Sequence, residues 1–194
     1  MPHLALAPAI EQLRRQFAQL SADADALVTP LSDHELSQQP PAGGWSVAQC
    51  IDHLNATARE YLPRLDEAIA EAIRRGLYGE GPFQYNWIGR LFVYSLEPPP
   101  RFRVKSPPPF QPIGSRSRQQ IMAAFRAYQV QYIDRLRQAN GLDLAGARVM
   151  SPAATWLRIP LGSGFAALAA HERRHLWQAR RVVQSIRQLP PRVD

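Results

Sequence analysis

Four long stretches of the chain carry apolar residues at the spacing of an α-helix, and this periodicity limits the folds that the chain can adopt. In the first stretch, apolar side chains recur every three or four residues and so share one helix face. They are Ile10, Leu13, Phe17, Leu20, Ala24 and Leu27. The same kind of pattern predicts helices over about 8–28, 46–75, 117–139 and 163–188. Four amphipathic helices with two long connections predict an all-α four-helix bundle.

Short sequence signals mark where the helices begin and end. Three pairs of residues have the spacing of a capping box, in which a hydroxyl and a side chain three residues later satisfy each other's backbone amides. The pairs are Ser32 with Glu35, Ser46 with Gln49, and Ser117 with Gln120. Asn140 and Gly141 predict a left-handed end for the third helix, and Ser163 is expected to cap the fourth.

The two long connections are rich in proline. Within 76–114, the spacing of aromatic residues predicts a short extra helix over 83–95, and the prolines of 98–112 predict an extended strap on the surface. Residues 142–162, which include Pro152, Trp156 and Pro160, are expected to form the second connection. A chain of 194 residues suits a single domain, 1–194, with its core over about 8–188.

The composition and the distribution of charge limit the kinds of partner that the chain is expected to have. The net charge is +7, but the 23 basic residues comprise one lysine, Lys105, and arginines spread through every segment. No basic run with interleaved aromatic residues occurs, and no helix-turn-helix or zinc-finger spacing. No apolar run is long enough to cross a membrane, and no signal-peptide pattern is present. With Cys50 as the only cysteine, no internal disulfide can form. We expect a cytoplasmic protein without nucleic-acid or membrane partners.

Two histidines occupy the inward seam of the fourth predicted helix, where apolar residues would be expected. His171 and His175 are four residues apart, so their rings lie about 40° apart around the helix axis. The same seam continues through Leu161, Leu168, Gln178 and Val182. A buried pair needs two sets of partners in one small volume, so it is either a hydrogen-bonded core pair or a pair of metal ligands. His53 is the other histidine that lies inside a well-predicted helix.

The segment from His171 to His175 also fits H-E-x-x-H, the helix motif of zinc peptidases, whose glutamate activates water. The extended motif requires glycine at 178 and histidine at 181, but the chain has Gln178 and Arg181 there. No strand pattern precedes this helix to provide a substrate-binding edge. The peptidase hypothesis is therefore disfavoured, and Glu172 is expected to be solvated or paired with an arginine.

Two motifs resemble those of the DinB-like (DinB/YfiT) superfamily. The segment GWSVAQCIDHL is similar to the opening of that family's second helix, and HERRHLWQ is similar to its last-helix motif. The order and spacing of the segments agree over about residues 8–188. The resemblance implies a four-helix bundle in which one histidine from the second helix and two from the last bind a divalent metal ion. By motif position, these ligands are His53, His171 and His175.

The resemblance leaves the activity open. The family includes thiol-dependent S-transferases and isomerases that use low-molecular-weight thiols, as well as many proteins of unknown function, and its members are often homodimers. Three imidazoles leave at least one position on an ion open for water or substrate, which is typical of catalytic sites. Zinc is the leading candidate, and nickel, iron and manganese also suit nitrogen ligands. We expect either a metal-dependent transferase or hydrolase acting on a small molecule, or a bundle that binds a metal or small ligand without turnover.

The other polar residues near the predicted ligands are expected to have structural roles. Cys50 lies one turn before His53, and a packed thiol is favoured over a fourth ligand or a reactive nucleophile. Asp52 points about 100° away from the neighbouring histidine, so it should support a ligand from behind or join a surface ion pair. His34 and His3 are expected at the surface.

Overall fold

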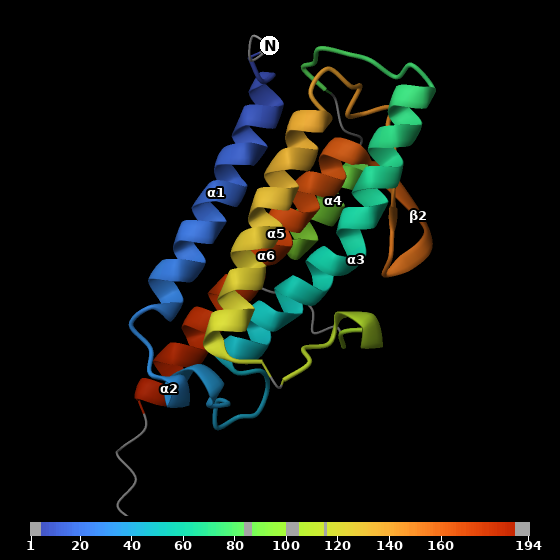
Figure 1. The fold of residues 1–194 in the computed structure, drawn as a ribbon. Coiled ribbons are helices and arrows are strands. Elements are labelled where there is room, and N and C mark those ends of the chain that lie inside the picture. Colours follow the sequence, from blue (N-terminus) through green and yellow to red (C-terminus); the bar gives the residue numbers. More distant parts are fainter. Residues whose placement is uncertain (1–4, 84–86, 100–104, 115, 189–194) are drawn as a thin grey trace, which may run out of the picture.

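The computed structural model describes the chain except for residues 1–4, 84–86, 100–104, 115 and 189–194. The elements in chain order are α1 (Pro8–Val28), α2 (Asp33–Ser37), α3 (Val47–Arg74), α4 (Trp87–Leu96), the 3-10 turn η1 (Pro108–Phe110), α5 (Arg118–Gln138), β1 (Arg148–Ser151), β2 (Ala154–Pro160) and α6 (Leu161–Arg187). The long helices α1, α3, α5 and α6 lie side by side as a four-helix bundle (Figure 1). The predicted bundle is therefore confirmed, with a two-stranded sheet added to it.

The signals at the helix ends act as predicted in four of five cases. The three predicted capping boxes are all formed, at the starts of α2, α3 and α5. Gly141, with φ +88°, takes the left-handed conformation after α5. The predicted cap at Ser163 is wrong, because α6 begins at Leu161. The amides of Leu161 and Gly162 donate instead to the carbonyls of Ala147 and Leu144, at 2.9 and 3.0 Å, so no side-chain cap is needed.

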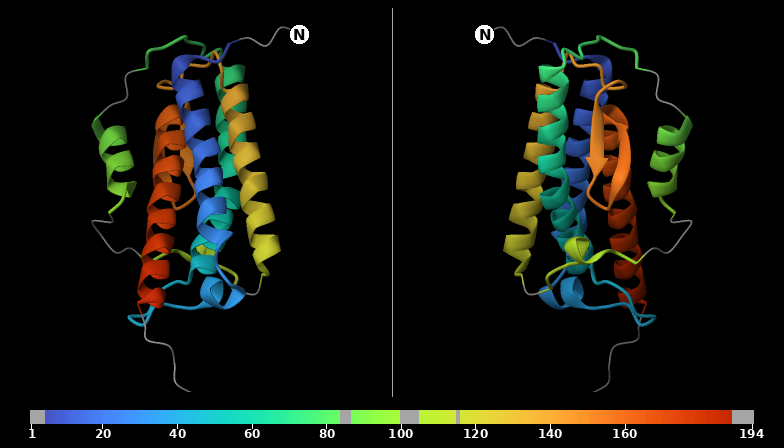
Figure 2. Two further views of the ribbon diagram at one scale, coloured as in Figure 1. Left: turned by 90° about the vertical axis from the view of Figure 1, so that its left-hand side faces the viewer. Right: turned by 90° about the vertical axis from the view of Figure 1, so that its right-hand side faces the viewer.

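Residues 142–162 contain an antiparallel hairpin, β1 and β2, which sequence analysis did not predict. Val149 and Ile159 pair across the hairpin, and both side chains are buried. Figure 2 shows the hairpin lying along α3 and α6. Gly164 of α6 lies directly beneath it, since a Cβ atom at this position would come 2.6 Å from Cγ1 of Val149.

Gly164→Ala is expected to destabilise the protein by about 1–3 kcal/mol, because Val149 and its strand would have to move. A glycine-to-alanine change inside a helix otherwise stabilises it by roughly 0.5–1 kcal/mol, so the sign of the effect reports the close packing. Urea denaturation measures it, with Gln184→Ala at an exposed position of α6 as the control. A Gly164→Ala protein more stable than the wild type would contradict the contact.

The first proline-rich connection differs in part from the prediction. The helix α4 overlaps the expected short helix over 83–95 and ends one residue later, and residues 84–86 are outside the described part of the chain. The strap is not fully extended, because Pro108–Phe110 forms a 3-10 turn. The fixed φ of proline suits this turn as well as polyproline helix. Burial of Phe110, which is 4% exposed, selects the turn and packs it against α3.

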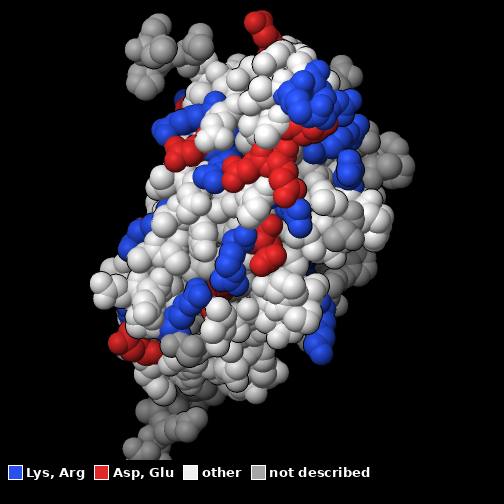
Figure 3. Space-filling model, turned by 45° about the vertical axis from the view of Figure 1, so that its right-hand side comes forward, with Lys and Arg blue, Asp and Glu red and all other residues white. Residues whose placement is uncertain are grey.

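The charged side chains are mixed at the surface. Arginine and acidic residues form ion pairs within α3 and between α3 and α5, as in Arg74 with Glu71 and Arg135 with Asp66. On the face drawn in Figure 3, acidic side chains lie among the basic ones. Among the described residues, no helix combines the length and apolar character needed to cross a membrane.

Candidate metal centre

The helices α3 and α6 bring three histidines together inside the bundle. Nε2 of His53 lies 3.3 Å from Nε2 of His171, and one ring nitrogen from each of His53, His171 and His175 lies within 4.8 Å of the others. The ring centroids are 4.4 to 5.1 Å apart. The convergence expected from the two motifs is therefore present, and its dimensions allow one ion to touch all three rings.

The proline-rich strap fixes the orientation of the first ring. Nδ1 of His53 lies 2.5 Å from the carbonyl oxygen of Phe110, in the turn η1. A carbonyl only accepts hydrogen bonds, so Nδ1 carries the proton and Nε2 keeps its lone pair. The lone pair is then on the nitrogen nearest His171, which is the tautomer required of a metal ligand with a backbone acceptor behind it.

Burial keeps all three rings neutral. It lowers the pKa of His171 to about 3, with further lowering from the charges of His53 and Arg174. Burial also lowers the pKa of His53, against a smaller opposite effect of the bond to Phe110. For His175, burial and then the neighbouring histidines hold the pKa well below its usual value. Neutral imidazole is the form that coordinates metals, so the rings do not need to lose a proton at pH 7.

The donor set fits a divalent metal ion. Nδ1 of His171 and Nδ1 of His175 are buried and have no hydrogen-bond partner among the described residues. An imidazole binds an ion through one of its two nitrogens, so Nε2 of His171, which faces His53, is the ligand atom of that ring, and its Nδ1 points away from the ion. Two nitrogen ligands of a tetrahedral zinc ion lie about 3.3 Å apart, which matches the measured separation between His53 and His171.

Glu172, between the two histidines of α6, does not join the cluster. It is 3% exposed, and Oε1 accepts a hydrogen bond of 3.0 Å from Nε2 of Gln129 on the diagonal helix α5. Burial raises its pKa to about 8. The expectation of a solvated or arginine-paired Glu172 is wrong, because α6 is turned so that this residue points into the bundle. A strand does precede α6, but the glutamate of H-E-x-x-H is directed away from the rings, so the peptidase arrangement is not formed.

Asp52 has the predicted ion pair but not the predicted exposure. Its carboxylate is 2% exposed, accepts a hydrogen bond of 2.6 Å from the amide of Ile113, and lies 3.2 Å from Arg116. These contacts tie α3 to the segment between η1 and α5. Asp52 is therefore a buried anchor for the strap that carries Phe110.

Comparison with known proteins supports the fold and the family. A family model described as the DinB superfamily matches residues 16–179. The chain belongs to the DinB superfamily. No protein with a curated description matches it. Among solved structures, it is similar to YfiT from Bacillus subtilis, described as a probable metal-dependent hydrolase with an unusual four-helix bundle topology. The two are 13% identical with a TM-score of 0.60, over 96% of this chain and 93% of that chain.

In this member of the DinB superfamily, Cys50 and His34 take no part in the cluster. Cys50 is fully buried, as predicted, and burial raises the pKa of its thiol to about 12. It therefore stays protonated at neutral pH and is a packed core residue. His34 is exposed on α2, also as predicted. His3 lies outside the described residues.

Trp45 forms a wall of the three-histidine cluster, a contact that sequence analysis missed. The residue precedes the serine that caps α3, and its ring centroid lies 4.7 Å from that of His53 and 5.8 Å from that of His175. A half-buried indole in this place shields two of the rings from water. The signal was available in the sequence, because the capping box places the tryptophan about two turns before His53.

Trp45 should report ion binding by its fluorescence. Addition of Ni²⁺ is expected to quench the tryptophan emission of the wild type, since a paramagnetic ion at the three rings would lie next to this indole. Trp45→Phe should bind Ni²⁺ but lose most of the quenching. Trp156→Phe, at an 83% exposed position on β2, should keep it. Equal quenching in the wild type and Trp45→Phe would show that the ion binds elsewhere.

Proposed function

We propose that this chain is a metal-dependent enzyme whose ion is held by His53, His171 and His175. The observation that carries the proposal is the cluster of three neutral imidazoles whose ligand atoms lie within 4.8 Å of one another. Zinc is the ion that we favour, and nickel, iron or manganese would suit the same nitrogens.

The chemistry that we propose is hydrolysis, or transfer to a thiol, of a small electrophilic molecule. A divalent ion with three protein ligands would lower the pKa of a bound water or thiol and so supply a nucleophile at neutral pH. The description of YfiT as a probable metal-dependent hydrolase supports the first reaction, and the resemblance to thiol-dependent family members supports the second. A homodimer and a cytoplasmic location stay predictions.

The surrounding residues would position and shelter the centre. The carbonyl of Phe110 orients His53, and Trp45 covers the rings on one side. Tyr61 packs against the ring of Phe110, and its hydroxyl lies 3.1 Å from Oγ of Ser151 on β1. This contact joins the hairpin to the strap beside the centre, so both connections contribute to holding one ligand in place.

A second candidate function is binding of a metal or small ligand without turnover. It is favoured by the placement of the carboxylates, because among the described residues no aspartate, glutamate or cysteine joins the three-histidine group. Glu172 faces Gln129, and Asp52 is held by Ile113 and Arg116. An enzyme built this way would rely on the ion rather than on a side-chain base.

The two functions are separated by assaying protein stripped of metal with a chelator and then reloaded with one equivalent of zinc. An enzyme is expected to hydrolyse a nitrophenyl ester, or to join a low-molecular-weight thiol to chlorodinitrobenzene, only after reloading. Reloaded His175→Ala is the matched control and should stay inactive. Stoichiometric zinc binding by the wild type without turnover of either substrate would overturn the proposed enzymatic function and favour binding without turnover.

A further inference from the structure

A cavity of about 730 Å³ lies between α4 and the first half of α6. Figure 2 shows α4 standing outside the four-helix bundle, on the side of α6. Ser163 and Ala166 of α6 line the cavity. Around the helix axis, the midpoint of these two residues lies roughly 130° from the midpoint of His171 and His175. The cavity is therefore on a different face of α6 from the proposed metal centre.

A structural ion pair holds the acidic residue at one end of the cavity. Nε of Arg173 donates to Oε2 of Glu97 at 3.0 Å, and a second guanidinium nitrogen donates to Oε1 at 2.5 Å. Arg173 also donates to the side chain of Gln16 on α1. These bonds pin the end of α4 to α6 and α1, and they neutralise the carboxylate of Glu97.

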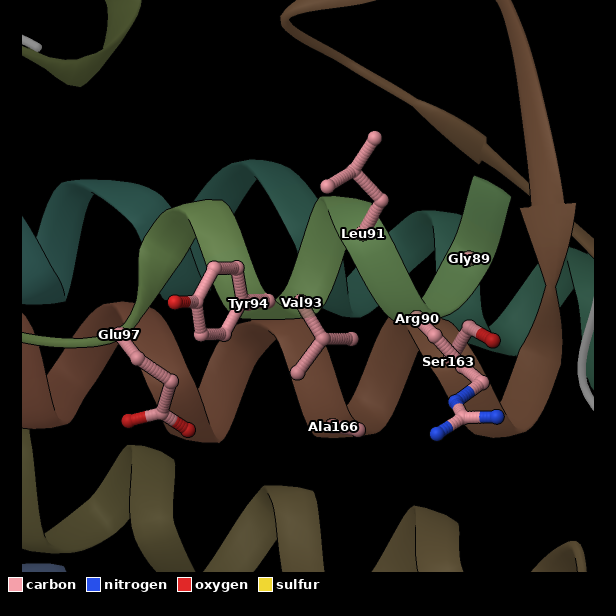
Figure 4. A pocket seen from close by; sticks show the side chains of 8 residues that line it. All are labelled: Gly89, Arg90, Leu91, Val93, Tyr94, Glu97, Ser163 and Ala166. Carbon is pink, nitrogen blue, oxygen red and sulfur yellow. The ribbon is translucent and has the colours of Figure 1, made fainter. Parts of the chain in front are cut away.

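The other end of the cavity carries a positive charge with no opposite charge beside it. Figure 4 shows Arg90 and Ser163 at one end of the row of lining residues, and Tyr94 and Glu97 at the other. Arg90 pairs with no carboxylate in the described part of the chain, because Glu97, the acidic residue of the cavity, is held by Arg173. The cavity thus has electrostatic complementarity to an anion at the Arg90 end.

Ser163 adds a buried polar residue to the lining of the cavity. The residue is 2% exposed and lines the cavity. It is not used as a helix cap, since the amides of Leu161 and Gly162 are satisfied by carbonyls of the preceding loop. A serine hydroxyl can donate a hydrogen bond, so Ser163 offers an anion a neutral donor at the same end of the cavity as Arg90.

We propose that this cavity binds a small organic anion with an apolar body. The carboxylate, phosphate or sulfonate of the ligand contacts the guanidinium of Arg90 and the hydroxyl of Ser163. Its apolar part lies against Val93 and Ala166, which line the middle of the cavity (Figure 4). The volume is within the range of about 300–1,000 Å³ that small-molecule sites occupy.

The probe for the test is octanoate, with octanol as its uncharged counterpart, both titrated by calorimetry. Octanoate is expected to bind about tenfold more tightly than octanol. Arg90→Gln should weaken octanoate binding by about tenfold, the size of a charge-assisted hydrogen bond, and should leave octanol unchanged. Arg158→Gln, at an exposed position of β2, is the matched control and should bind octanoate as the wild type does.

Two further variants separate this site from the metal centre and from other occupants. His171→Ala should bind octanoate like the wild type, because the cavity does not contain the histidines. Ala166→Phe should lose both probes by filling the cavity, with circular dichroism as the check on folding. If Ala166→Phe did not fold, the effect of Arg90→Gln, a change at an exposed position, would still test whether the anion binds in this cavity. Octanoate binding that is unaffected by Arg90→Gln would overturn the proposal. The proposal would also be overturned if the wild type were a dimer that did not bind octanoate and Ala166→Phe were a monomer, because a second copy of the chain would then cover the cavity.

Discussion

His171→Ala is expected to bind zinc at least about a hundredfold more weakly than the wild type. The ring supplies one of three clustered nitrogens, and even groups that only orient a ligand contribute roughly 10–100-fold to metal affinity. His53→Ala and His175→Ala should behave alike, because each leaves two ligands. Competition with a chromophoric chelator measures the affinity, and circular dichroism confirms that each variant is folded.

The matched control for these variants is His34→Ala. His34 is exposed on α2, away from the cluster, so its loss should leave zinc affinity unchanged. Undiminished zinc binding by both His53→Ala and His171→Ala would show that the three rings hold no ion. A loss confined to His34→Ala would place the ion at the surface instead.

The metal-free protein is expected to lose about 2 kcal/mol of stability between pH 6.5 and pH 8. The pKa of Glu172 is raised from 4.5 to about 8 by burial, so in this range the folded state binds a proton that the unfolded state has released. Stability from such a group is complete below pH 4.5 and is lost as the pH rises through 8. Each pH unit in between costs about 1.4 kcal/mol.

The histidines act in the opposite direction but at lower pH. The pKa of His171 falls from 6.5 to about 3 on folding, so the stability that it contributes rises with pH and is complete above about 6.5. The maximum stability of the metal-free protein should therefore lie near pH 6.5. Urea denaturation across pH 5–8.5, in the presence of a chelator, measures this profile.

Glu172→Gln isolates the contribution of the buried carboxyl. The amide is close in shape and has no proton to release, so the fall in stability between pH 6.5 and 8 should disappear. Glu71→Gln, at a half-exposed position on α3, should keep the wild-type profile. A fall that persists in Glu172→Gln would assign it to another group.

The helices and their ends could be predicted because their signals are local. The three capping boxes are each contained in four residues and are formed as expected. The convergence of the histidines could be predicted from the seam of α6 together with the two family motifs. The hairpin was not, because strands of four and seven residues give little periodicity, and the contact beneath them depends on Gly164 of a separate element.

The exposure of Glu172 was predicted wrongly because the charge of the side chain was given more weight than its position on the helix. The seam through Leu168 and Val182 is correct, but the buried face of α6 is wider. Position 172 is surrounded at helical spacing by residues that are almost fully buried. They are Phe165, Leu168, Ala169, Leu176 and Ala179. This arrangement was visible in the sequence and predicts a buried side chain at 172, whatever its chemistry.

The acceptor that holds His53 is a main-chain oxygen, and this has a consequence for how such a centre can vary. Replacing the side chain of Phe110 leaves the carbonyl in the covalent chain, so point substitutions act on it only indirectly. Insertions or deletions in the proline-rich connection would instead move the oxygen and turn the imidazole. Two chains with the same three histidines could then differ in metal preference through the length of a loop that contains none of them.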